Sequence, residues 1–330
     1  SQRGSQSIAS SPDLHEGFEG ILEETKALLK RYKIQPKRSL GQNFCIDLAL
    51  MKRMVGYCDV NREDIVLEIG AGLGNLTTVL AKTAGEVLAV ELDHHLVEAL
   101  QGRLGNLRNV RVIEGDILDL RASGFQKIVS NPPYSISSSL LLLILGWRFT
   151  CAILTLQQEF AAKLKAKKGD EEYCPLTVLT NYKTTIEVLE HVPRNSFYPQ
   201  PKVESVVLQI RLQPPAFHVR DEEVFQNLVK ALFTQRNRKA KNGLGAFLRN
   251  YAGASKEELA KLLEGKPFLD RRIRELAPKE FADLANKITD LAKSKRIVYD
   301  GKSFYVFPEV YEPSEDSFLL ARYVDARPRE

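Results

Sequence analysis

The sequence predicts an α/β protein with a mostly parallel sheet, an antiparallel last strand and a small C-terminal helical domain. Between residues 65 and 156, short apolar runs alternate with segments of helical periodicity, which is typical of parallel strands joined by crossover helices. Two later β-rich runs, 185–192 and 205–212, leave no room for a crossover helix, so we expect them to pair antiparallel at the end of the sheet. After residue 215 the pattern becomes helical and basic.

The elements follow in a regular order along the chain. An amphipathic helix at 13–32 comes first, and we expect it to pack on the body of the protein. The parallel strands are predicted at 65–69, 86–91, 110–114, 127–130 and 151–156. The later helices are predicted at 221–234, 240–250, 255–263 and 278–292. The chain therefore divides into an N-terminal extension (1–36), an α/β domain (37–212), a basic helical domain (213–292) and a C-terminal extension (293–330) of unknown role.

Composition narrows the class of protein and of partner. The net charge of +5 is modest, but residues 230–300 contain 17 Lys and Arg against 9 Asp and Glu, which favours a polyanionic partner. The four cysteines form no C-x-x-C pair, so we expect reduced thiols and no metal site. The most apolar run, 140–145, is too short to cross a membrane, and the chain shows no secretion-signal pattern. We therefore expect a cytoplasmic protein.

A glycine-rich turn directly follows the first parallel strand. Gly70 and Gly72 let the backbone approach a ligand closely, although Asn75 stands where a dinucleotide fingerprint has its third glycine. Glu91 ends the next strand, where a carboxylate can accept hydrogen bonds from both hydroxyls of a ribose. Asp116 closes the third strand and can accept from an adenine amine. The pattern predicts a cofactor that contains a nucleoside, and on these residues alone a nicotinamide cofactor remains open.

The fourth strand ends in the tetrapeptide Asn131-Pro132-Pro133-Tyr134, at the sheet edge where such folds bind ligands. The side-chain oxygen of Asn131 and the carbonyl of Pro132 can accept hydrogen bonds from a ring-conjugated amine and direct its lone pair at an electrophilic carbon. Tyr134 offers a flat face on which a base can stack. No general base is required, because an amine that has attacked the carbon carries a positive charge and loses its proton readily. A turn that only ends a strand is the alternative interpretation.

An aromatic and proline-rich loop, 197–205, joins the last two strands. Phe197 can close the second face of a flipped base, and Lys202 can contact a phosphate. A rigid hairpin connection without a ligand is equally consistent with the loop.

Together these motifs resemble those of the KsgA-type rRNA adenine N6,N6-dimethyltransferases over residues 37–290. The similar segments are 39–44, 68–74, 131–134, 197–205 and 232–239 with Asn242 and Leu244. The resemblance implies a Rossmann-like class I methyltransferase in which the α/β domain binds S-adenosylmethionine and catalyses, and the helical domain binds RNA. The residues implied at the cofactor are Gln42, Asn43, Cys45, Glu68, Gly70, Gly72, Glu91, Leu92, Asp116, Ile117 and Asn131. The residues implied at RNA are Lys202, Arg236, Arg238, Lys239 and Lys241.

The resemblance also implies the reaction. Two adjacent adenosines of small-subunit rRNA would each receive two methyl groups on N6 during ribosome biogenesis, with Asn131, Pro132, Tyr134 and Phe197 at the flipped base. The family usually has Leu at two positions where this chain has Pro132 and Cys45. Each residue would act through its backbone, which tolerates these changes. We expect a monomer acting on rRNA or an immature small ribosomal subunit. For the basic residues, a solvated helix face is the alternative.

Two other functions remain open on the sequence. The tail 311–320 resembles the opening segment of HemK-type glutamine methyltransferases, which also use an Asn-Pro-Pro-Tyr tetrapeptide, so a protein glutamine methyltransferase is one alternative. The basic helical domain and the 197–205 loop argue against it. A non-catalytic ribosome assembly or transcription factor on the same fold is the other, and the combination of Glu91, Asp116 and Asn131 disfavours it.

Overall fold

The fold is described from a computed structural model, over residues 12–37, 41–252, 264–293, 296–299 and 302–305. The chain divides into two compact units, one made of residues 1–165 and 183–214 and the other of 166–182 and 215–330. Sequence reasoning assigns 166–182 to the α/β domain, whereas the structure groups this segment with the helices. The physical reason is Tyr173, which is 1 % exposed and packs edge-on against Phe233 with 5.6 Å between ring centroids.

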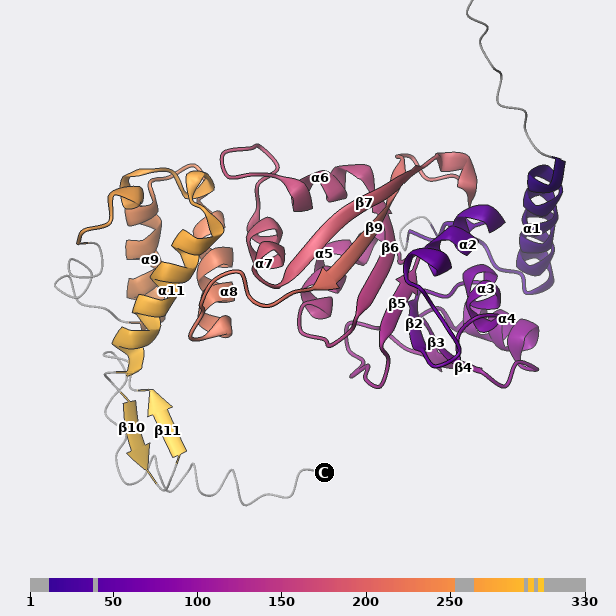
Figure 1. The fold of residues 1–330 in the computed structure, drawn as a ribbon, viewed down its shortest axis with the longest axis horizontal. Coiled ribbons are helices and arrows are strands. Elements are labelled where there is room, and N and C mark those ends of the chain that lie inside the picture. The colour runs from indigo at the N-terminus through magenta and orange to yellow at the C-terminus, as the bar shows by residue number, and fades with distance from the viewer. Residues whose placement is uncertain (1–11, 38–40, 253–263, 294–295, 300–301, 306–330) are drawn as a thin grey trace, which may run out of the picture. The chain divides into compact units, whose positions relative to one another are not determined.

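The first unit is built on a seven-stranded sheet with the order β4-β3-β2-β5-β6-β9-β7 (Figure 1). Its strands are β2 (Ile65–Ile69), β3 (Glu86–Glu91), β4 (Val110–Glu114), β5 (Lys127–Ser130), β6 (Cys151–Gln157), β7 (Thr184–Val192) and β9 (Ser205–Leu212). Pairing from β4 to β6 is parallel, and β9 runs antiparallel to both of its neighbours. The parallel strands therefore end at one common edge.

The predicted strands are confirmed, most of them to the residue. The last strand is antiparallel as expected, but β9 lies between β6 and β7, so the sheet edge belongs to β7. A register shift between Val188 and Glu190 interrupts the pairing of this edge strand. A separate short ladder joins β1 (Phe44–Cys45) to β8 (Phe197–Tyr198).

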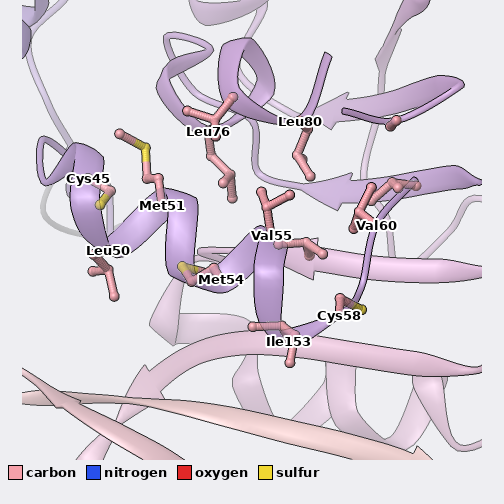
Figure 2. Close-up of a cluster of buried hydrophobic side chains, with 14 of the residues drawn as sticks. Cys45, Leu50, Met51, Met54, Val55, Cys58, Val60, Leu76, Leu80 and Ile153 are labelled. Atoms are coloured by element: carbon pink, nitrogen blue, oxygen red, sulfur yellow. The ribbon is translucent and has the colours of Figure 1, made fainter. Parts of the chain in front are cut away.

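The helices of the first unit bury their apolar faces on the sheet and on one another. They are α1 (Pro12–Arg31), α2 (Leu48–Tyr57), α3 (Asn75–Ala81), α4 (His94–Leu104), α5 (Ser137–Ile144) and α6 (Gln158–Lys165), with short 3-10 turns at Tyr134–Ile136 and Arg194–Ser196. Helix α2 begins where the side chain of Asp47 accepts a hydrogen bond from the Leu50 amide at 2.9 Å. Figure 2 shows the apolar face of α2, including Met51 and Met54, packed with α3 and with Ile153 of β6.

The N-terminal helix α1 packs on the first unit, as predicted. Thr25 is completely buried and Leu29 is 7 % exposed. Ile21 packs against the main core cluster, and Glu24 forms an ion pair with Arg103 of α4 at 2.8 Å. Helical spacing places these four residues of α1 on neighbouring turns, so the amphipathic pattern reports a real packing surface.

The second unit is helical and has its own aromatic core. Its elements are α7 (Pro175–Lys183, whose last residue falls in the first unit), α8 (Glu222–Phe233), α9 (Ala240–Ala252), α11 (Pro278–Lys293) and two 3-10 turns, Pro267–Asp270 and Ile273–Glu275. Asp221 starts α8 by accepting from two backbone amides at 3.0 Å, and Phe233 stacks on Phe281 of α11 at 5.5 Å. Three of the predicted helices are thereby confirmed, and the one at 255–263 lies outside the described residues.

The C-terminal extension contributes a two-stranded hairpin, β10 (Arg296–Tyr299) with β11 (Lys302–Tyr305). The segment 311–320 that resembles a glutamine methyltransferase lies outside the described residues. Within the part of the chain that is described, no helix has the length and apolar character required to span a membrane.

Candidate active site

A cleft lies at the common edge where β2, β3, β4 and β5 end. Residues at or directly after the ends of all four strands line it, and part of it is open to solvent. All of the residues predicted at the cofactor line its walls: Gln42, Asn43, Cys45, Glu68, Gly70, Gly72, Glu91, Leu92, Asp116, Ile117 and Asn131. They come from five segments far apart in sequence, so the tertiary fold brings them together.

The glycine turn forms the cleft floor and leaves no space for side chains. Gly70 has φ +72° and Gly72 has φ +58°, conformations that residues with a Cβ rarely adopt. A Cβ on Gly70 would lie 2.8 Å from Cδ of Pro133, and one on Gly72 would lie 3.0 Å from the Phe44 ring. The turn is therefore in close contact with the Asn131 tetrapeptide on one side and with β1 on the other.

Glu91 presents a fixed carboxylate at the end of β3. One oxygen accepts from the Gly72 amide at 2.8 Å, and the other accepts from the amides of Leu92 and Asp93 at 2.8 and 2.9 Å. Burial raises the pKa of Glu91, and these backbone hydrogen bonds partly oppose the shift. Because each carboxylate oxygen has two lone pairs, the three amides orient the group and still leave acceptor capacity for a ligand hydroxyl.

Glu68, at the end of β2, is a buried acid with a free acceptor. The side chain is 2 % exposed, and its Oε2 has no hydrogen-bond partner among the described residues. Burial raises the pKa of Glu68 to about 8; the neighbouring Thr77 opposes this rise, and the nearby Glu91 charge adds to it. An unpaired buried acceptor costs free energy, so this oxygen marks a place where a donor or a cation from a ligand would be stabilised.

Asn131 provides the second free acceptor of the cleft. Its Oδ1 is buried without a partner among the described residues. The preceding Ser130 is fully buried and fixes the backbone, because its hydroxyl donates to the carbonyl of Ile69 at 2.5 Å and accepts from the same residue's amide at 3.2 Å. This pair of bonds ties β5 to β2 at the point where the tetrapeptide and the glycine turn begin, and it holds Asn131 at the cleft.

The rest of the tetrapeptide is anchored to the sheet. The Tyr134 hydroxyl lies 2.6 Å from Oγ of Ser205, the first residue of β9. Burial raises the pKa of Tyr134 to about 12, so the phenol remains protonated at neutral pH. Pro132 is buried close to Gly70, and of the first three tetrapeptide residues Asn131 and Pro133 line the cleft.

The structure corrects the prediction for Phe197. Its ring is 2 % exposed and packs in the main core cluster with Met51. The β1–β8 ladder pairs Phe197 with Cys45, a residue that lines the cleft. Lys202 is exposed, and its carbonyl accepts from Arg194 at 3.2 Å.

Asp93 and Lys37 shape the cleft but are missing from the predicted set. Asp93 lines the cleft and accepts from Nζ of Lys37 at 2.6 Å and from Nε2 of Gln42 at 3.3 Å. Burial would raise the pKa of Asp93, but these hydrogen bonds outweigh it and the pKa is lowered. An Asp directly before a predicted helix is an N-cap signal, and Asp93 does accept from the His95 amide at 3.1 Å, so the sequence contained a clue to its position.

The cleft fits S-adenosylmethionine. Glu91 keeps acceptor capacity for a ribose hydroxyl, and one oxygen of Glu68 has no partner among the described residues and can accept from a hydrogen-bond donor. Leu92, which is 53 % exposed, offers an apolar surface for an adenine ring. The order of strands and the position of this cleft define the protein as a Rossmann-like methyltransferase dependent on S-adenosylmethionine.

Comparison with known proteins identifies the family. Residues 34–289 match the family model described as ribosomal RNA adenine dimethylase, and the chain belongs to this family. It is 38 % identical to a probable ribosomal RNA small subunit methyltransferase A of Methanosarcina barkeri, over 84 % of this chain and 96 % of that protein. A protein described in the same words from Methanothermobacter thermautotrophicus is 36 % identical, over 83 % of this chain and 99 % of the relative.

Solved structures agree with this assignment. A dimethyladenosine transferase from Plasmodium falciparum is 26 % identical, with a TM-score of 0.62 over 72 % of this chain and 94 % of that one. The 23S rRNA methyltransferase ErmE is also 26 % identical, with a TM-score of 0.55 over 75 % of this chain and its whole length.

The basic residues predicted to bind RNA in the helical unit have differing surroundings. They lie in the turn between α8 and α9 and at the start of α9, not along one helix face. Arg236 donates to the carbonyls of Asp170 and Glu171 at 3.3 and 2.6 Å. Lys239 and Lys241 both pair with Asp270, at 3.5 and 2.8 Å, and Arg238 is exposed.

Proposed function

We propose that the protein transfers methyl groups from S-adenosylmethionine to N6 of two adjacent adenosines in small-subunit rRNA, twice on each, during ribosome biogenesis. The observation that carries the proposal is the buried Oδ1 of Asn131, which has no partner among the described residues, on the wall of the cleft at the strand ends. Relatives described as small-subunit rRNA methyltransferases support the choice of substrate. We further propose that the protein acts as a monomer in the cytoplasm, on an immature small ribosomal subunit.

The tetrapeptide would activate the adenine amine by accepting its hydrogens. The N6 lone pair is delocalised into the ring, so the amine is a weak nucleophile. Oδ1 of Asn131 and the carbonyl of Pro132 would each accept one N6 hydrogen, which stabilises the positive charge that develops on the nitrogen. The Tyr134 phenol stays protonated, and the proton of the acidic product amine leaves to solvent.

The carboxylates of the cleft would hold and orient the cofactor. Glu91 would accept from a ribose hydroxyl, Asp116 from the adenine amine, and Glu68 from a donor of the methionine part. When bound, S-adenosylmethionine supplies a methyl group activated by its sulfonium. The chain's contribution is thus to position two reactants and to exclude water between them.

The helical unit would position RNA through its phosphates. Arg238 is the best candidate for a phosphate contact, because it is exposed and lies among other cations. Lys239 and Lys241 would exchange their pairing with Asp270 for a phosphate, and Lys202 would contribute from the first unit. Arg236 already holds the backbone of the 166–173 segment, so we propose a supporting role for it.

The test is transfer of labelled methyl to immature small ribosomal subunits, in parallel with a translation release factor, followed by nucleoside and peptide analysis. We expect dimethyladenosine at two adjacent positions of the RNA. Label on a release-factor glutamine instead would show a glutamine methyltransferase. Tight binding to the subunit without any label would show a non-catalytic assembly factor.

A further inference from the structure

A buried polar network connects helix α1 to the glycine turn of the cleft. The Asn75 amide group donates to Oγ1 of Thr25 at 3.1 Å and to the carbonyl of Cys45 at 2.8 Å. Its oxygen accepts from Arg103 at 2.6 Å, and the same Arg103 nitrogen donates to the carbonyl of Leu73 at 2.7 Å. The network therefore joins four elements of the first unit: α1, β1, the glycine turn with α3, and α4.

The members of the network depend on one another because they are shielded from water. Thr25 is 0 % exposed, Asn75 is 8 % exposed, and the side chain of Arg103 is 13 % exposed. The Asn75 side chain has two N–H donors and one oxygen, and all three groups are bonded. Loss of one partner would leave a buried polar group unpaired, which costs more than the bond itself contributes. Glu24 adds a second link from α1 by pairing with Arg103.

The network also explains why this glycine turn has Asn at its last position. Cys45, Leu73 and Asn75 all line the cofactor cleft. The carbonyls of Cys45 and Leu73 are held by bonds from Asn75 and Arg103, and the Asn75 amide is in turn held by Thr25. A glycine at position 75 would leave the carbonyl of Cys45 and the hydroxyl of Thr25 without this donor.

We propose that Thr25 is a positioning residue for the cofactor, so that α1 forms part of the cofactor site. When α1 docks through Thr25 and Asn75, it holds the glycine turn and β1 in the arrangement that binds the cofactor. By thermodynamic linkage, cofactor binding stabilises the docking of α1 to the same extent. This inference rests on the proposed assignment of the cleft to the cofactor.

The test measures two quantities on the full chain: the Kd of S-adenosylhomocysteine by calorimetry, and hydrogen exchange of the backbone amides of residues 19–31. In the wild type, bound S-adenosylhomocysteine should slow exchange in α1. Thr25→Val keeps the shape of the side chain and removes the hydrogen-bond acceptor. We expect this variant to bind S-adenosylhomocysteine about tenfold more weakly, and the ligand to slow exchange in α1 less than it does in the wild type. Thr25→Ser should restore both quantities, and Glu19→Ala, at an exposed position of the same helix, should change neither.

The outcomes separate the possible failures. If Thr25→Val lowers only the Tm and binds like the wild type, Thr25 has a structural role and the inference is overturned. Unchanged exchange of α1 in the wild type on saturation with S-adenosylhomocysteine overturns it as well, and this measurement needs no variant to fold. If the wild type does not bind S-adenosylhomocysteine at all, the cofactor assignment itself has failed, which is a different result.

Discussion

The cofactor cleft and the basic turn between α8 and α9 are both predicted as binding surfaces, and their side chains are in opposite states. In the cleft, buried oxygens of Glu68 and Asn131 have no partner among the described residues. In the basic turn, Arg236 is bonded to backbone carbonyls and Lys241 pairs with Asp270. The cleft therefore has acceptors that a ligand could satisfy, whereas several cations of the basic turn already have partners within the protein.

This difference shows which observation identifies a site more strongly. A buried acceptor without a partner raises the free energy of the folded protein, so its presence indicates a ligand. An exposed charge is stable in water and in weak ion pairs, so its presence alone indicates little. Substitutions in the cleft should therefore have large effects, and those in the basic turn small ones.

The largest effect is expected from Asn131→Ala. Loss of the acceptor for the adenine amine should reduce kcat about 10³-fold, while the Kd of S-adenosylhomocysteine changes little. Methyl transfer to immature subunits under saturating cofactor measures the first quantity, and calorimetry measures the second. Asn106→Ala, at an exposed turn, is the matched control. A fully active Asn131→Ala would remove the acceptor mechanism from consideration.

Glu68 should make stability depend on pH. Its pKa rises from the ordinary 4.5 to about 8 in the folded protein, so the folded state binds the proton more tightly than the unfolded state. The contribution of Glu68 to the free energy of unfolding should therefore be most favourable below pH 4.5. As pH rises toward 8, the free energy of unfolding should fall by on the order of a few kcal/mol. Glu68→Gln should flatten this slope, as measured by urea unfolding from pH 5 to 9. Equal slopes for both proteins would contradict the burial argument.

Glu91→Gln should weaken cofactor binding by about 10- to 100-fold, since it removes the charge and one acceptor from a group fixed by three amides. The Kd of S-adenosylhomocysteine is the measurement. Glu86→Gln, at the opposite end of the same strand, is the control. If both variants bind equally well, Glu91 does not contact the ribose.

The smallest effects are expected in the basic turn. Arg238→Ala should weaken RNA binding about threefold and lower the slope of log K against log salt by about 1, as for the loss of one phosphate contact. Lys241→Ala should have less effect, because Asp270 competes for its charge. Filter binding of an rRNA fragment at several salt concentrations gives both slopes. A larger loss of RNA affinity for Lys241→Ala than for Arg238→Ala would contradict the argument that a paired cation contributes less than an exposed one.

Much of the first unit was predictable because its signals are local. The strand β2 and the glycine turn after it are recognisable from β-branched residues followed by glycines, and the strand bounds agree with the structure. Since parallel strands must end at one edge, Glu91 and Asn131 could be placed in one cleft without coordinates. The mutual geometry that leaves Oδ1 of Asn131 without a partner among the described residues could not be predicted in this way.

Other features depended on contacts between distant residues. Phe197 is aromatic and lies in a proline-rich loop, which suggests a stacking role, but it is 2 % exposed and lies in the same core cluster as Cys45. Segment 166–182 follows a strand and helix of the α/β unit, yet Tyr173 packs against Phe233 and places it in the helical unit. Neither contact has a periodic signal in the sequence.

The sequence by itself determined the order of strands and helices along the chain and the chemical types at the ends of the parallel strands, because periodicity and turn residues act over short distances. It also carried the resemblance to rRNA dimethyltransferases. Only the tertiary structure decided which of those groups have partners. Among the described residues, one oxygen of Glu68 and that of Asn131 have no partner, whereas Asn75 is satisfied by Thr25 and Arg103. The reason is that burial and hydrogen-bond pairing depend on the neighbours that folding brings together.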